Sequence, residues 1–150
     1  MSDVKVGVIG AGAWGTALAI HTARKGMETT LWAREPEVVA DIEQRRENRL
    51  FLPGFEVPDK LHATNDLERC VRQARLLLSV VPTPFVADVM GQIVDWLDED
   101  QLIVSCSKGI ENDTLETLDE ILRRVLPRRH HAQMAFLSGP SFAKEVAEMV

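Results

Sequence analysis

Short apolar runs alternate along this chain with longer segments in which apolar residues recur at helical spacing. The runs are rich in valine, isoleucine and leucine, which is typical of strands that are buried on both faces of a parallel sheet. We therefore predict β-strands at residues 4–9, 28–33, 75–82, 101–107 and 133–139.

The segments between these runs predict helices, and several carry residues that begin or end a helix. Gly26 suits the C-terminal stop of the first helix, and Pro36 suits the first position of the second. Asp66 and Thr114 suit N-caps of later helices. Residues 48–64 contain two prolines and one glycine and predict an ordered loop. The expected helices cover residues 14–25, 36–46, 67–74, 83–97 and 115–126, with a last helix after residue 139.

The regular alternation of strand and helix predicts one parallel sheet with helices on both faces, which is a doubly wound α/β fold. Residues 1–150 are expected to form one domain, because no shift in composition marks an internal boundary. The final segment reads as a helix without a Gly or Pro stop. We therefore expect the chain to be the front part of a longer protein.

Three glycines stand between the first strand and the first helix, in the sequence VIGAGAWGTALA. Gly10, Gly12 and Gly15 form the G-x-G-x-x-G pattern, in which the first glycine permits a tight turn and the second lets a pyrophosphate approach the backbone. The third lets the helix pack closely on the strand, and the N-terminus of that helix attracts the phosphate charge. In this context the pattern predicts a Rossmann-type dinucleotide-binding domain over residues 1–150.

The second strand ends in LWAR, where many such proteins carry an acid that binds the adenosine ribose. Arg34 could pair with a 2′-phosphate and stack on adenine, which favours NADP without excluding NAD. The alternative is a solvated Arg34 with Glu35 as the ribose ligand. Trp14 either packs on the neighbouring loop or forms a wall of the cofactor site.

Candidate ligand contacts also follow the later strands, because ligands of open α/β sheets bind beyond the carboxyl ends of the strands. Lys108 follows the strand at 101–107 and could meet a phosphate, a carbonyl or the cofactor. Gly139 and Ser141 follow the strand at 133–139, at a helix start that could bind an anion or a hydroxyl. The alternative for Ser141 is a plain N-cap, and a capping role does not exclude contact with a ligand. The turn PTPF after the third predicted strand either lies beside the nicotinamide or is an ordinary loop.

Composition narrows the classes of partner. The net charge of −6 argues against nucleic acid, and no apolar stretch reaches the roughly 20 residues of a membrane span. The start MSDVKV shows no charged segment followed by an apolar one, and Cys70 and Cys106 are expected to be buried thiols. Both features favour a cytoplasmic protein. His130 and His131 lie in a polar turn without further ligand residues nearby, so we expect no metal site.

Taken together, several stretches resemble the NAD(P)-dependent glycerol-3-phosphate dehydrogenases of bacteria. The likeness extends over essentially the whole chain, and it is most specific in the last two of the stretches VIGAGAWGTALA, LWAR, FLPG, VVPT, SKGIE and SGPSFAKEV.

The resemblance implies particular contacts. Cofactor contacts fall on Ala13, Trp14, Arg34, Lys108 and Ala143, and substrate contacts fall on Lys108, Gly139 and Ser141. Ala13 departs from the serine frequent at that position, so its expected contact is made by the main-chain N–H.

The resemblance also implies reversible hydride transfer between NAD(P)H and dihydroxyacetone phosphate or sn-glycerol 3-phosphate, for phospholipid synthesis. Lys108 would polarise and orient the substrate. The proton-transferring lysine of the family is expected beyond Val150, in a helical second domain, so this chain should bind cofactor without turnover. A homodimer is expected for the full-length protein.

Two other functions compete with this one. The first is a related NADP-dependent reductase of hydroxy-acid or ketopantoate type, and the second is a non-catalytic dinucleotide sensor. A sensor would need no substrate site at Lys108 or in the turn at 138–141, so these residues favour an enzyme.

Overall fold

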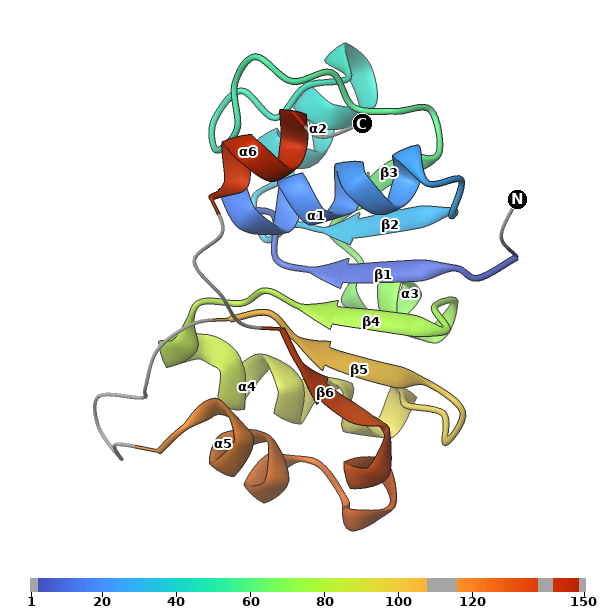
Figure 1. The fold of residues 1–150 in the computed structure, drawn as a ribbon, viewed down its shortest axis with the longest axis vertical. Helices are drawn as coiled ribbons and strands as arrows, with labels where there is room; N and C mark the ends of the chain where they lie inside the picture. The colour runs from blue at the N-terminus through green and yellow to red at the C-terminus, as the bar shows by residue number, and fades with distance from the viewer. Residues whose placement is uncertain (1–2, 108–115, 138–141, 149–150) are drawn as a thin grey trace.

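The computed structural model describes residues 3–107, 116–137 and 142–148. Its centre is a sheet of six parallel strands in the order β3-β2-β1-β4-β5-β6 (Figure 1). The strands are β1 (Val6–Ile9), β2 (Thr29–Trp32), β3 (Leu61–Thr64), β4 (Leu76–Ser79), β5 (Leu102–Ser105) and β6 (Met134–Phe136). The strands β2 and β3 lie on one side of β1, and the next strand, β4, lies on the other side of β1, followed by β5 and β6. This reversal confirms the predicted doubly wound fold.

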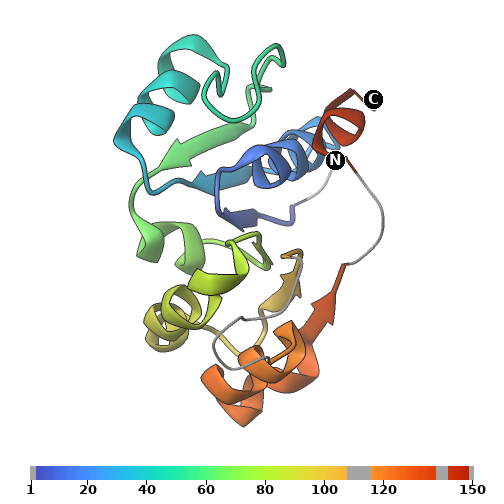
Figure 2. The same cartoon turned by 90° about the vertical axis from the view of Figure 1, so that its left-hand side faces the viewer.

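Helices cover both faces of the sheet. The core cluster on one face takes residues from α1, α2 and α6, and the cluster on the other takes residues from α3, α4 and α5. Although α6 is the last helix, it lies beside α1 in both views (Figures 1 and 2). The helices are α1 (Ala13–Arg24), α2 (Pro36–Arg45), α3 (Leu67–Arg72), α4 (Thr83–Ile93), α5 (Leu118–Val125) and α6 (Ala143–Glu148), with two 3₁₀ turns, η1 (Val94–Trp96) and η2 (Arg128–Gln133).

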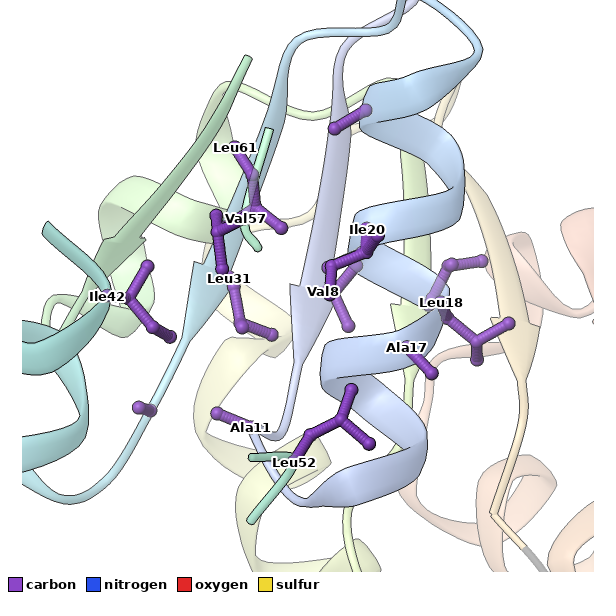
Figure 3. Close-up of a cluster of buried hydrophobic side chains, with 14 of the residues drawn as sticks. Val8, Ala11, Ala17, Leu18, Ile20, Leu31, Ile42, Leu52, Val57 and Leu61 are labelled. Atoms are coloured by element: carbon purple, nitrogen blue, oxygen red, sulfur yellow. The ribbon is translucent and has the colours of Figure 1, made fainter. Parts of the chain in front are cut away.

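The core forms because β1 is buried along its whole length between the two helical layers. Figure 3 shows Val8 of β1 beside Ile20 of α1, with Leu31 of β2 next in the same layer. Burying such a side chain stabilises the fold by about 1.5–3 kcal/mol relative to leaving it exposed. The continuous apolar runs of the sequence are therefore strands that contact side chains on both faces.

The C-terminus of α1 and the N-terminus of α3 follow the predicted chemistry. Gly26 has a φ of 95°, its N–H donates to Ala23 O, and the N–H of Met27 donates to Thr22 O. These two bonds form a Schellman motif, which requires a residue with positive φ at that position. The predicted stop at Gly26 is confirmed, as is the Asp66 cap of α3, whose carboxylate accepts from the Arg69 N–H at 3.1 Å.

The prediction of a loop over the whole of residues 48–64 is wrong, because its last four residues form β3 at the edge of the sheet. Only Leu61 of this strand is fully buried, so the apolar run that marks the other strands is missing. Its position depends on tertiary contacts instead. The Arg46 guanidinium donates to the carbonyls of Pro58 and Leu61, and the N–H of Ala63 donates to Glu43.

Two boundaries in the C-terminal half also differ from expectation. The N-cap of α5 is Thr117 rather than Thr114, and a capping box joins Thr117 to Glu120. This T-x-x-E pattern was visible in the sequence and is the stronger start signal, because it satisfies two amide groups reciprocally. The last strand begins only at Met134, since η2 occupies residues 128–133. Thr114 itself lies outside the described residues.

Candidate nucleotide-binding crevice

A crevice opens at the carboxyl ends of β1 and β4, where the direction of chain growth in the sheet reverses. Its larger cavity has a volume of about 580 Å³, and a smaller one of about 250 Å³ adjoins it; both are lined by Val80, Val81 and Pro82. Open α/β sheets bind ligands at this switch point. The position of the crevice therefore agrees with the prediction made from the glycines.

The three glycines of the first turn have separate steric environments. Gly10 has a φ of 119°, and a Cβ there would lie 2.8 Å from Val80 O. A Cβ on Gly15 would lie 1.8 Å from Gly10 O, so α1 can approach the turn only because this residue is glycine. A Cβ on Gly12 would meet nothing within 4 Å, and Gly12 lines the larger cavity. Gly10 and Gly15 thus serve the turn and the helix packing, whereas the space at Gly12 is open to a ligand.

The N-terminus of α1 supplies positive potential to the crevice. Its N-cap is Gly12, which has no side chain to satisfy the first amide groups, and its first turn contains no acidic residue. In a helix the first four N–H groups have no intrahelical acceptor, and the aligned peptide dipoles place about half a positive charge at this end. The arrangement suits an anionic group such as a pyrophosphate.

Arg34 and Phe85 stand together at the wall of the larger cavity. The Arg34 guanidinium carbon lies 5.7 Å from the centroid of the Phe85 ring, and both side chains are exposed. Such an exposed cation–π contact contributes only about 0.5–1 kcal/mol, whereas a hydrogen bond to a charged group contributes about 1.5–3 kcal/mol. Arg34 can therefore turn from the ring to a phosphate. Glu35 and Asp88 also line this cavity, so its lining carries two carboxylates besides the Arg34 guanidinium.

Trp14 and Ala143 lie on the smaller cavity, although they are far apart in the sequence. The Trp14 indole N–H donates to Cys106 O at 3.1 Å, and this bond connects the first turn of α1 to the end of β5. Ser107 lines the same cavity, and its hydroxyl donates to the carbonyl of Val81. Of the two interpretations offered for Trp14, the structure combines loop packing with a place on the cavity wall.

The crevice thus unites several residues predicted to contact the cofactor. Gly10, Gly12 and Arg34 line the larger cavity, and Trp14 and Ala143 line the smaller one. Ala13 and Gly15 belong to the first turn of α1 beside it. The predicted residues Lys108, Gly139 and Ser141 lie outside the described residues.

Several lining residues were not singled out from the sequence. Phe51 lies in the segment expected to be a loop, and Asp88 and Val89 project from α4. Phe85 is the last residue of the quoted turn PTPF, and its aromatic ring after a strand end was the available signal. Phe51 carried no comparable signal, because it approaches the glycine turn only in the folded chain.

Burial shifts the pKa of both cysteines and of His130, and of these three residues Cys106 lines the smaller cavity. Cys70 and Cys106 are buried free thiols as expected, and burial raises the pKa of Cys70 to about 12 and that of Cys106 to about 11. His130 is buried as well, and desolvation lowers the pKa of its imidazole. In the described part of the chain, no three His, Cys, Asp or Glu side chains gather into a metal-binding group. Within those same ranges, every helix is too short or too polar to cross a bilayer.

The comparisons with known proteins agree with the fold. The family model described as NAD-dependent glycerol-3-phosphate dehydrogenase N-terminus matches residues 5–150. Glycerol-3-phosphate dehydrogenase (NAD(P)+) of Citrifermentans bemidjiense is 50% identical over 143 residues, which are 95% of this chain and 43% of that protein. This chain therefore spans less than half the length of such relatives.

Solved structures show the same relationship. Glycerol-3-phosphate dehydrogenase from Coxiella burnetii superposes with a TM-score of 0.85 at 32% identity, over 96% of this chain and 43% of that one. A ketopantoate reductase from Ralstonia eutropha gives a TM-score of 0.64 at 26% identity, over 88% of this chain and 39% of that one.

The fold and the crevice at its switch point define the chain as a Rossmann-like α/β protein. More narrowly, it belongs to the family of the N-terminal regions of NAD-dependent glycerol-3-phosphate dehydrogenases. The resemblance inferred from the sequence is thereby confirmed.

Proposed function

We propose that residues 1–150 are the dinucleotide-binding domain of an NAD(P)-dependent glycerol-3-phosphate dehydrogenase. The observation that carries this proposal is the open space at Gly12, at the N-terminus of α1 and at the switch point of the sheet. A pyrophosphate needs both close backbone approach and positive potential, and this place offers the two together. Membership of the family supports NAD or NADP as the ligand.

The remaining contacts follow from the direction in which a dinucleotide would extend across the crevice. From a pyrophosphate at the α1 N-terminus, the adenosine half would extend toward Arg34 and Phe85 on the larger cavity. The nicotinamide half would extend toward Trp14, Ser107 and Ala143 on the smaller one. A bound nicotinamide would supply the hydride chemistry, and these side chains would hold its ring and keep water from it.

Arg34 supports acceptance of NADP. It is the only cationic side chain among the described residues that line the two cavities, and its guanidinium can form two hydrogen bonds to a 2′-phosphate. Glu35, the N-cap residue of α2, lines the same cavity and can accept from the ribose hydroxyls of NAD. The pair thus suits use of both cofactors, with Arg34 favouring NADP.

The proposed substrate pair is dihydroxyacetone phosphate and sn-glycerol 3-phosphate, which the names of the relatives support. Lys108, Gly139 and Ser141 are the proposed substrate contacts, and Lys108 would also touch the cofactor. A lysine beyond Val150 would transfer the proton at the C2 oxygen, so the 150-residue chain would bind cofactor without turnover. We further propose that the full-length protein acts in the cytoplasm as a homodimer.

The competing functions receive less support. The TM-score falls from 0.85 for the Coxiella burnetii dehydrogenase to 0.64 for the ketopantoate reductase, so the backbone favours the first class. A dinucleotide sensor would share the crevice, and turnover separates it from an enzyme.

The test has two stages. In the first stage, NADPH and NADH are titrated into the protein while its tryptophan fluorescence is followed. This signal is suitable because Trp32 lines the larger cavity and Trp14 lines the smaller one. The full-length protein is then given dihydroxyacetone phosphate, and oxidation of NADPH is measured at 340 nm, the absorption wavelength of the reduced nicotinamide. Binding followed by turnover supports the proposal. Binding without turnover would favour the sensor or another substrate, and absence of binding would overturn the proposal altogether.

A further inference from the structure

Asn48 is a buried polar residue whose hydrogen bonds reach the glycine turn from a distant part of the sequence. It lies between α2 and β3, and its side chain is 1% exposed. Its Nδ2 donates to Ala11 O at 3.0 Å and to Thr16 Oγ1 at 2.8 Å. Its Oδ1 accepts from the N–H of Phe51 at 3.1 Å. Both donors and the acceptor of this amide are therefore used.

The carbonyl of Ala11 is the common point of these contacts. Thr16 also donates its hydroxyl to Ala11 O, at 3.2 Å, so two buried side chains bind the same oxygen. Leaving such buried groups without partners costs about 1–3 kcal/mol each, so an apolar residue cannot replace Asn48 without disturbing the turn. The two bonds hold the oxygen toward Asn48 and α1.

The orientation of this carbonyl decides that of the next amide. The peptide between Ala11 and Gly12 is trans, and in a planar trans peptide the C=O and N–H point in opposite directions. Anchoring Ala11 O on the protein side therefore turns the Gly12 N–H to the opposite side. Gly12 is exposed and lines the larger cavity, so that is the side a ligand would occupy. Without an anchor this peptide could rotate, because glycine tolerates most backbone conformations.

We propose that Asn48 is a positioning residue for dinucleotide binding, which pins the Ala11–Gly12 peptide so that the Gly12 N–H faces the pyrophosphate. This inference rests on the proposed function of the crevice. The same residue also holds the neighbouring wall, because Asn48 O accepts from the N–H of Leu52 at 2.9 Å. Leu52 in turn is buried beside Ala11 (Figure 3), which keeps Phe51 at the cavity.

A residue elsewhere in the chain provides a matched control. Gln101 is 3% exposed, and its Nε2 donates to Val71 O and Ala74 O at 2.7 and 2.8 Å. Its Oε1 accepts from the N–H of Asp98, so its set of bonds equals that of Asn48. Gln101 precedes β5 and thus lies at the amino edge of the sheet, opposite the crevice. Replacing either amide disturbs a buried network, but only one of the two networks contains the glycine turn.

The experiment compares Asn48→Ala with Gln101→Ala in the full protein chain, by thermal unfolding and by NADPH titration. We expect both variants to melt at lower temperature. The Kd for NADPH should rise about 10- to 100-fold in Asn48→Ala, as expected for loss of one well-oriented bond to a charged group, and less than about twofold in Gln101→Ala. If Asn48→Ala and the unmodified protein bind NADPH with equal affinity, the inference about Asn48 is overturned and the proposed function is not. An unmodified protein that binds neither NADPH nor NADH would overturn the proposed function with it.

Two further variants keep the test decisive. If Asn48→Ala does not fold, Thr16→Val removes one of the two anchors of Ala11 O and should weaken NADPH about three- to tenfold, while Thr16→Ser should restore binding. Asn48→Ala is also made in the Phe51→Ala chain. Loss of affinity by a similar factor in both backgrounds supports action through Gly12. No further loss in the Phe51→Ala chain would mean that Asn48 acts only by placing that ring, which overturns the inference.

Discussion

Replacement of Gly12 by alanine should separate dinucleotide binding from folding. In the free protein the new Cβ would meet no heavy atom within 4 Å, and the φ of −68° and ψ of −172° at Gly12 suit any L-residue. Alanine is a poorer N-cap than glycine, but it restricts the unfolded chain, and the two effects oppose each other. We expect the free energy of unfolding to change by less than about 1 kcal/mol, or about 4 °C in Tm.

Binding should respond very differently, because the methyl group would stand where a pyrophosphate approaches the N-terminus of α1. Loss of one hydrogen bond to a charged group removes about 1.5–3 kcal/mol, which corresponds to a rise in Kd of about 10- to 100-fold. The assay pairs NADPH titration with thermal unfolding. Gly12→Ala should therefore keep its Tm and lose its affinity.

Two other glycines provide controls. Gly15→Ala would place a Cβ 1.8 Å from Gly10 O, so it should destabilise the fold by about 3 kcal/mol or more and lower Tm by at least about 6 °C. Gly91→Ala adds the same methyl to α4, where the nearest heavy atom is Val125 Cγ1 at 3.8 Å, and should leave Kd unchanged. A Gly12→Ala protein that binds NADPH as tightly as the unmodified one would refute the assigned position of the pyrophosphate.

Three further outcomes can be measured. Arg34→Asp should raise the Kd for NADPH about tenfold or more relative to that for NADH, because it replaces the cation nearest the expected 2′-phosphate by an anion; an unchanged ratio would remove Arg34 from cofactor selection. Thr117→Ala should lower the free energy of unfolding by about 1 kcal/mol and Tm by about 2–4 °C through loss of the α5 capping box, whereas Thr117→Ser should change neither. The pKa of His130 is lowered in the folded protein, so the unfolded chain binds the proton first and stability is lost as pH falls below 6.5. Between about pH 7 and pH 5.5, which bracket the usual imidazole pKa of roughly 6.5, Tm should decline less in His130→Leu than in the unmodified protein. Equal declines in the two proteins would contradict the role of His130.

Local patterns in the sequence were sufficient to predict most of the strands and the glycine turn. Five of the six strands were predictable because a strand buried on both faces must be apolar along its length, as β1 is. The glycine turn was predictable as well, since the conformation at Gly10 and the contact at Gly15 exclude side chains. These requirements are local, so the residues that meet them stand close together in the chain.

The edge strand β3 could not be predicted in the same way. Only the first of its four residues is fully buried, and it forms because β2 offers a free edge and Arg46 binds the carbonyls of Pro58 and Leu61. The N-cap of α5 is a different case. Its capping box at Thr117 and Glu120 was readable, and the earlier threonine at 114 merely competed with it.

For the crevice, the sequence by itself determined the glycine turn, the residue at the end of β2 and the order of the strand ends, because each depends on a short segment. Only the tertiary structure decided which distant residues complete it. Asn48 reaches Ala11 across 37 positions, and Trp14 reaches Cys106 across 92. No local pattern predicts such pairs, since a hydrogen bond between distant segments depends on how the sheet and its helices bring those segments together.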